Sequence, residues 1–162
     1  MLIKGVIDED FVNYKLPSMF ISTAFCDFKC EKESGVRCCQ NSALTAQKEV
    51  EYDTKELVTR YIDNPITKAV VFGGREPMMQ YDDITDFMSC LRYDHLCSDP
   101  VVIYTGYDKT EISYQVEMLR LFGNVTVKFG RFVPNCEPHF DPVLGVNLAS
   151  PNQYAEELCD AR

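Results

Sequence analysis

Four cysteines lie close together in the first quarter of the chain. Cys26 and Cys30 are separated by three residues just after the apolar run 20–25, and the adjacent pair Cys38 and Cys39 follows. Thiolates at such spacings, in a protein that is not secreted, favour a metal centre over a disulfide. A zinc knuckle, a cluster held by all four thiols and simple reduced cysteines are the alternatives that the spacing leaves open. We therefore expect the chemistry to lie on this loop.

The length and composition predict one globular domain over residues 1–162. The chain is 46% hydrophobic and 25% charged, which argues against a disordered protein. It has no run of about 18 apolar residues, and residues 1–10 lack the basic-then-apolar order of a signal peptide, so we expect a cytoplasmic protein. Eight cysteines in that compartment should be mostly reduced.

The formal net charge of −9 disfavours two classes of partner. Phosphate backbones and anionic membranes repel an acidic surface unless a basic patch overrides it, and no two Lys or Arg residues are adjacent here. We therefore expect no direct nucleic-acid binding and no membrane docking. The acidic excess favours a solvated surface that can steer docking onto a basic partner.

Short apolar runs alternate with segments of helical periodicity. Strands are predicted at 20–25, 69–72, 101–104, 125–129 and, more weakly, 143–149, with a Pro-rich loop at 130–142. Helices are predicted to begin at Asp53, at Asp82 or Asp83 and at Asp108, followed by a short last helix at 152–159.

Two of these elements carry more detailed expectations. In the first helix, one buried face should be formed by Leu57, Val58, Tyr61 and Ile62. In the strand 125–129, apolar residues alternate with polar ones, which places the strand near a sheet edge with one face in solvent.

Strands that alternate with helices predict a mostly parallel sheet with right-handed crossovers. About five strands are too few for a closed eight-stranded barrel. We expect an α/β fold, an open, partial β/α barrel of about five mostly parallel strands with flanking helices, or else a doubly wound sheet. In either fold, ligands collect at the carboxyl ends of the strands. The cysteine loop, the segments 73–77 and 105–107, and Arg131 follow successive predicted strands.

The cysteine loop followed by the Gly-Gly-Arg-Glu-Pro segment at 73–77 resembles the radical S-adenosylmethionine (SAM) enzymes. Within that superfamily, four further strings resemble the activating protein of anaerobic ribonucleotide reductase, a glycyl radical activase. They are Asp10-Phe11-Val12-Asn13, Tyr104-Thr105-Gly106-Tyr107, Gly130-Arg131-Phe132 and Ser150-Pro151-Asn152-Gln153. These strings span nearly the whole chain in the order of the family.

The resemblance implies an oxidoreductase with two cofactors, a 4Fe-4S cluster held by three thiolates and SAM. One iron stays open for the amino and carboxylate groups of SAM, and an electron from the cluster cleaves the sulfonium to methionine and a 5′-deoxyadenosyl radical. That radical would take a hydrogen from a glycine of a partner. The implied partners are the large subunit of a glycyl radical reductase and an electron donor such as flavodoxin or ferredoxin.

The resemblance also implies the metal ligands Cys26, Cys30 and Cys39. The usual pattern of the family is C-x3-C-x2-C, and the loop is several residues longer here. Cys39 is taken as the third ligand because Cys39-Gln40-Asn41 matches the Cys-x-Asn of the activases, with Cys38 as the competitor. The longer loop adds little closure entropy, about 0.6 kcal/mol for a doubling of length.

The remaining site residues follow the second and third predicted strands and the last one. Gly73, Gly74 and Glu76 are expected to meet the SAM amino group, although Arg75 is either inserted into the family's pattern or replaces a glycine. Two further residues, Thr105 and Tyr107, are expected to line the SAM pocket. Asn152 is expected either to bind cofactor or partner or to cap the last helix. No catalytic side chain is expected beyond these cofactors.

Overall fold

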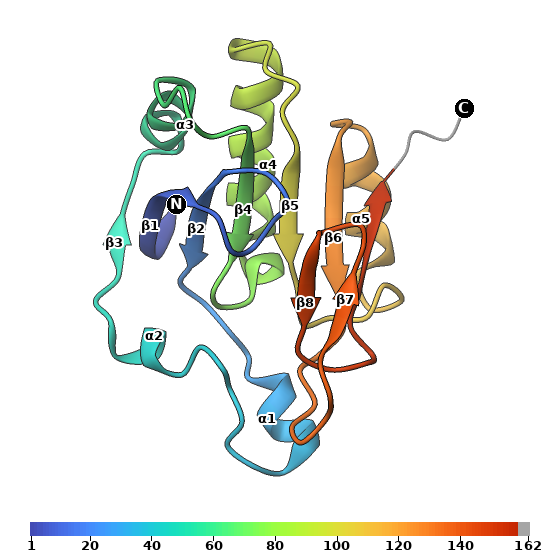
Figure 1. The fold of residues 1–162 in the computed structure, drawn as a ribbon. Helices are drawn as coiled ribbons and strands as arrows, with labels where there is room; N and C mark the ends of the chain where they lie inside the picture. Colours follow the sequence, from blue (N-terminus) through green and yellow to red (C-terminus); the bar gives the residue numbers. More distant parts are fainter. Residues whose placement is uncertain (159–162) are drawn as a thin grey trace.

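The computed structural model describes residues 1–158, so Cys159 and the end of the predicted last helix lie outside the described residues. A mixed sheet of seven strands, in the order β3-β1-β2-β4-β5-β6-β9, dominates this part of the chain (Figure 1). Its strands are β1 (Leu2–Asp10), β2 (Ser18–Thr23), β3 (Val50–Glu51), β4 (Ala69–Gly73), β5 (Val101–Tyr104), β6 (Val125–Phe129) and β9 (Tyr154–Leu158). A separate pair is formed by β7 (His139–Asp141) and β8 (Val146–Leu148).

The helices are short. They are α1 (Lys29–Ser34), α2 (Ala43–Ala46), α3 (Thr54–Ile62), α4 (Tyr81–Ser89) and α5 (Ser113–Arg120), with a 3₁₀ turn at Pro77–Gln80 and a π-helical turn at Cys90–Asp94. No helix in the described part of the chain is both long and apolar enough to cross a lipid bilayer.

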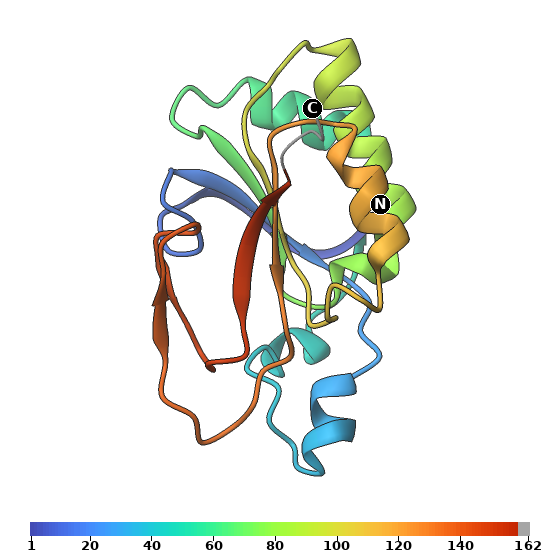
Figure 2. The same cartoon turned by 90° about the vertical axis from the view of Figure 1, so that its right-hand side faces the viewer.

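The centre of the sheet is parallel and buried. β2, β4, β5 and β6 run in the same direction, and the apolar residues of β4 and β5 are fully buried. Helices α3, α4 and α5 cover one face, while the β7–β8 pair lies over the other (Figure 2). The larger hydrophobic core lies between the sheet and the helices, and a smaller core, which includes Tyr14, Leu144 and Leu148, lies under the β7–β8 pair. Continuous apolar strands are typical of parallel sheets covered on both faces.

The expectation of a partial β/α barrel of about five mostly parallel strands with flanking helices is wrong. The sheet is mixed, because β1 and β3 add antiparallel strands beside β2, and β9 adds one beside β6. A doubly wound sheet is not found either, since helices α3, α4 and α5 lie on one face only (Figure 2).

The predicted last helix at 152–159 is instead the strand β9. A helix as short as 152–159 is marginal in water, whereas pairing with β6 satisfies the backbone groups of both strands. Because β9 covers the edge of β6 and the β7–β8 pair covers its face, every residue of β6 is buried. The prediction of a half-solvated edge strand at 125–129 is therefore wrong as well. Strand β7 lies in the region expected to be loop.

The helix starting at Asp53 is confirmed. The Asp53 side chain accepts a hydrogen bond from the Lys55 N–H at 2.7 Å, so the first turn is capped. Leu57, Val58 and Tyr61 are buried as expected, but Ile62 is 39% exposed at the last position of the helix.

Candidate metal and cofactor site

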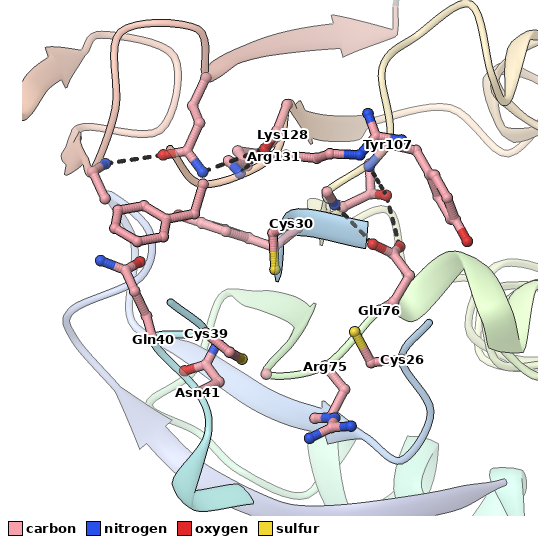
Figure 3. A pocket seen from close by; sticks show the side chains of 18 of the residues that line it. Cys26, Cys30, Cys39, Gln40, Asn41, Arg75, Glu76, Tyr107, Lys128 and Arg131 are labelled. Atoms are coloured by element: carbon pink, nitrogen blue, oxygen red, sulfur yellow. Dashed lines mark hydrogen bonds between the residues drawn. The ribbon is translucent and has the colours of Figure 1, made fainter. Parts of the chain in front are cut away.

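One pocket of about 320 Å³ lies at the carboxyl ends of the four parallel strands (Figure 3). Each of these strands is followed by residues that line it. They are Cys26, Cys30 and Cys39 after β2, Gly74, Arg75 and Glu76 after β4, Thr105, Gly106 and Tyr107 after β5, and Gly130, Arg131 and Phe132 after β6. Segments far apart in sequence thus meet where parallel sheets usually place their ligands.

The cysteine loop leaves β2 and passes below the sheet with α1 and α2 (Figure 1). Phe28, in the left-handed conformation with φ of 56°, precedes α1, and Gly35 ends it with φ of 71°. Cys26, Cys30 and Cys39 line the pocket, whereas Cys38 does not. The Cys38 Sγ lies 3.3 Å from the Ser34 Oγ.

The donor chemistry of this loop fits an iron-sulfur cluster. Three free, half-buried thiols border one pocket, and the Phe28 N–H donates to the Cys26 Sγ at 3.3 Å. Burial and the nearby thiols raise the pKa of Cys30 to about 11, so metal binding there must displace a proton. In residues 1–158, no three His, Cys, Asp or Glu side chains are gathered closely enough to hold a metal ion.

Arg75, the residue that departs from the Gly-Gly-Glu-Pro pattern, lies across this loop. Its guanidinium stacks on the Phe28 ring at 4.6 Å from the ring centre, and its Nη1 donates to the Thr45 Oγ1. The side chain therefore ties both ends of the cysteine loop to the end of β4. Its Nε is buried without a hydrogen-bond partner, and its charge acts against the burial that raises the Cys26 pKa. An unpaired N–H and a positive charge beside a thiol suit a bound anionic cluster.

Glu76 joins the ends of β4 and β5. Its carboxylate is 5% exposed and accepts hydrogen bonds from the Thr105 Oγ1 at 2.6 Å, the Gly106 N–H at 2.8 Å and the Met78 N–H at 3.1 Å. Burial raises the pKa of Glu76 in spite of these donors. The carboxylate is therefore held in one orientation in the pocket wall.

The two glycines before Arg75 differ in role. Gly74 lines the pocket with φ of +79°, and a Cβ there would lie 2.9 Å from the Ser22 Cβ. Gly73 does not line it, and a Cβ there would lie 2.9 Å from the Phe20 ring. Packing thus requires glycine at both positions, and only Gly74, whose positive φ also favours glycine, lines the pocket.

Tyr107 and Arg131 form a polar wall beside the cysteine loop. The Tyr107 hydroxyl donates to the Asp27 Oδ2 at 2.9 Å, and the Lys29 Nζ lies 4.5 Å from the centre of the Tyr107 ring. The Arg131 guanidinium lies 2.6 Å from Glu111 and 3.1 Å from Glu33 of α1. These contacts hold α1 against the loops that follow β5 and β6.

Asn152 and Gln153 lie in the turn before β9. The Asn152 Nδ2 donates to the Arg131 carbonyl at 2.8 Å, and Asn152 does not line the pocket. Gln153 does line it, and its Oε1 accepts from the Ala149 N–H at 3.0 Å. The idea that Asn152 caps a helix is wrong, because a strand follows it.

Sequence reasoning missed Lys128, which is 6% exposed and lines the pocket from β6. In the predicted edge strand, a lysine between valine and phenylalanine is expected to point to solvent. The sequence pattern did not decide whether Lys128 is buried, because that depends on whether β6 is the last strand of the sheet.

Three half-buried thiols border one pocket, and their chemistry suits a thiolate-bound metal centre. Residues 18–143 match the family of 4Fe-4S single cluster domains, and the chain belongs to that family. It therefore contains a 4Fe-4S cluster domain, as expected for an iron-sulfur protein. Neither a curated protein nor a solved structure matches the chain.

Proposed function

We propose that this protein is a radical SAM activase that generates a glycyl radical on an anaerobic ribonucleoside-triphosphate reductase. The observation that carries the proposal is the shared pocket: the thiols of the cysteine loop and the residues after β4 and β5 line the same cavity. A cavity of about 320 Å³ is at the lower end of the range for small-molecule sites.

The proposed cluster ligands are Cys26, Cys30 and Cys39. All three line the pocket, while the Cys38 Sγ turns to the Ser34 hydroxyl and lies 3.8 Å from the Cys30 carbonyl oxygen. Three ligands leave one iron for SAM, and a 4Fe-4S group bound here supplies the electron for cleavage of the sulfonium. The chain itself has to orient SAM and exclude water.

The residues after β4 and β5 supply that orientation. Gly74 has no Cβ and exposes backbone to the pocket, and Glu76 presents a carboxylate that three donors hold in place. Thr105 is fixed by its bond to Glu76, and Tyr107 closes the side next to Asp27. In this proposal Gly73 and Asn152 support the SAM site through packing and through the Arg131 carbonyl.

A protein substrate fits the surroundings of the pocket. Phe11, Val12 and Phe140 are more than half exposed, and they lie in the β1–β2 loop and in β7. The β1–β2 loop also contributes Asn13 to the pocket, and β8, the partner of β7, contributes Asn147. Apolar side chains beside a pocket favour docking of another protein. The proposed partner is the large subunit of the reductase, with flavodoxin or ferredoxin as electron donor.

The test is anaerobic reconstitution with iron and sulfide, followed by reduction in the presence of SAM. We expect release of 5′-deoxyadenosine and methionine, its loss in Cys39→Ala, and its retention in Cys136→Ala, a matched thiol outside the pocket. No release, or a cluster held by all four thiols of the loop, would indicate an electron-transfer module instead. Release of 5′-deoxyadenosine without a glycyl radical on the added reductase would contradict the activase assignment alone.

A further inference from the structure

The pocket is cationic in a chain that is strongly acidic overall. Four cationic side chains line it, Lys29, Arg75, Lys128 and Arg131, against only two carboxylates, Asp27 and Glu76. The chain as a whole has a net charge of −9. A local excess of positive charge in such a protein favours an anionic occupant.

These four cations are not equivalent. Lys29 and Arg131 pair with Glu111 at 3.0 and 2.6 Å, and Arg75 is committed to the cysteine loop. Lys128 is the most buried of the four, and like Arg75 it makes no ion pair within residues 1–158, but it contacts no part of the cysteine loop in a hydrogen bond. Its Nζ donates to the Gly130 carbonyl at 2.8 Å, which uses one of its three N–H groups.

No salt bridge neutralises this ammonium in the described part of the chain. Glu76 is the acid that acts on Lys128 electrostatically, but three donors from other residues already occupy its carboxylate, and the two side chains form no salt bridge. Burial lowers the pKa of Lys128 to about 8, so the group is still mostly charged at neutral pH. A buried charge without an ion-pair partner is unfavourable, and buried charges in proteins are usually paired with an opposite charge.

We infer that Lys128 forms an anion subsite in this pocket, which takes the carboxylate or phosphate oxygens of a small ligand. The ammonium on β6 has two N–H groups left for the ligand, and the Gly130 carbonyl, which also accepts from the Gln153 Nε2 at 3.3 Å, fixes its position. Tyr104, the register partner of Lys128 in β5, stays neutral at pH 7 because burial raises its pKa, and the carboxylate of Glu76 is already occupied by its three donors. The subsite shares the pocket with the proposed function but does not depend on radical chemistry.

The experiment is calorimetric titration of the full, anaerobically reconstituted chain with two probe pairs. S-adenosylhomocysteine and its methyl ester differ only in the carboxylate charge, and adenosine 5′-monophosphate and adenosine differ only in the phosphate. We expect the wild type to prefer one anionic probe over its neutral twin by about tenfold or more. Lys128→Met should remove that preference and leave binding of the neutral twin unchanged. The pair that responds identifies the source of the anion.

Lys109→Met is the matched control, since it removes the same charge outside the pocket, where Lys109 pairs with Glu156. It should keep the preference. The inference is overturned if the wild type prefers neither anion, if Lys128→Met retains the preference, or if it loses the anionic and neutral probes equally. It is also overturned if Lys128→Met loses iron as Cys39→Ala does, because Lys128 would then balance the cluster. If Lys128→Met loses the preference but the wild type does not cleave SAM, the proposed function is refuted and the anion subsite is retained.

Discussion

At the scale of single residues, the proposed activity depends on which thiols bind the cluster. Cys39 borders the pocket, and its N–H is held by the Glu31 Oε1 at 3.1 Å, while Cys38 turns to Ser34. We predict that Cys39→Ala abolishes the cluster and that Cys38→Ala retains it, as measured by iron and sulfide content and visible absorption. The reverse pattern would make Cys38 the third ligand.

Lys128 provides a second prediction at this scale, about stability. The folded pKa of about 8 lies below the ordinary value of 10.5, so between these two values the unfolded chain holds more protons than the folded one. Stability from this group therefore rises with pH across that window, and below it the charged Lys128 destabilises the fold. We predict that Lys128→Met stabilises the ligand-free protein at pH 7 by on the order of 2 kcal/mol.

Urea unfolding measures this effect. Glu76 and Tyr104 are the titratable groups nearest in the pocket wall, and both remain in the variant, so the comparison of wild type and Lys128→Met isolates the lysine. The advantage of the variant should shrink at about pH 10, where the wild-type lysine is neutral. An advantage of equal size at both pH values would mean that packing, not charge, is responsible.

At the scale of elements, the turn after β6 links the pocket to β9. Gly130 has φ of +93°, and a Cβ there would lie 2.7 Å from the Asn152 carbonyl oxygen. Gly123 has φ of +65°, and nothing lies within 4 Å of the position that its Cβ would take. Substitution of Gly123 therefore measures backbone strain without a steric clash. We predict that Gly123→Ala costs about 1 kcal/mol and that Gly130→Ala costs at least about 2 kcal/mol more. Equal losses in chemical denaturation would show that the 150–153 turn moves freely.

The strands differ in how well the sequence predicts them. β4 and β5 were predicted nearly to the residue, because continuous apolar runs of that length are typical of buried parallel strands. β9 was predicted as a helix because its local composition, with Ala, Glu and Leu, favours one. Only the unpaired edge of β6 makes it a strand, and that edge is a long-range property. β1 was missed because its acidic end hides the alternation around Ile3.

In the candidate site, too, local patterns were predictive and long-range packing was not. The cysteines, Gly74, Glu76, Thr105 and Tyr107 were predicted from residue type and from their positions after predicted strands, and the structure brings them to one pocket. Lys128 was not predicted, since its burial depends on β9 and on the β7–β8 pair, whose places the local pattern did not give.

At the scale of the whole molecule, the asymmetry of the sheet shapes the site. Helices α3, α4 and α5 cover one face, and the other carries the β7–β8 pair (Figures 1 and 2). Residues of the cysteine loop and of β8 both line the pocket. The proposed cluster ligands and the inferred anion subsite thus share one pocket in a chain of 162 residues.

The most direct test of the central claim is electron paramagnetic resonance of the reduced, anaerobically reconstituted protein with and without SAM. We predict a 4Fe-4S signal that changes when SAM is added and that couples magnetically to an isotope-labelled SAM amino nitrogen, because three thiolate ligands would leave one iron open. A signal that SAM leaves unchanged, or zinc in place of iron, would contradict this prediction.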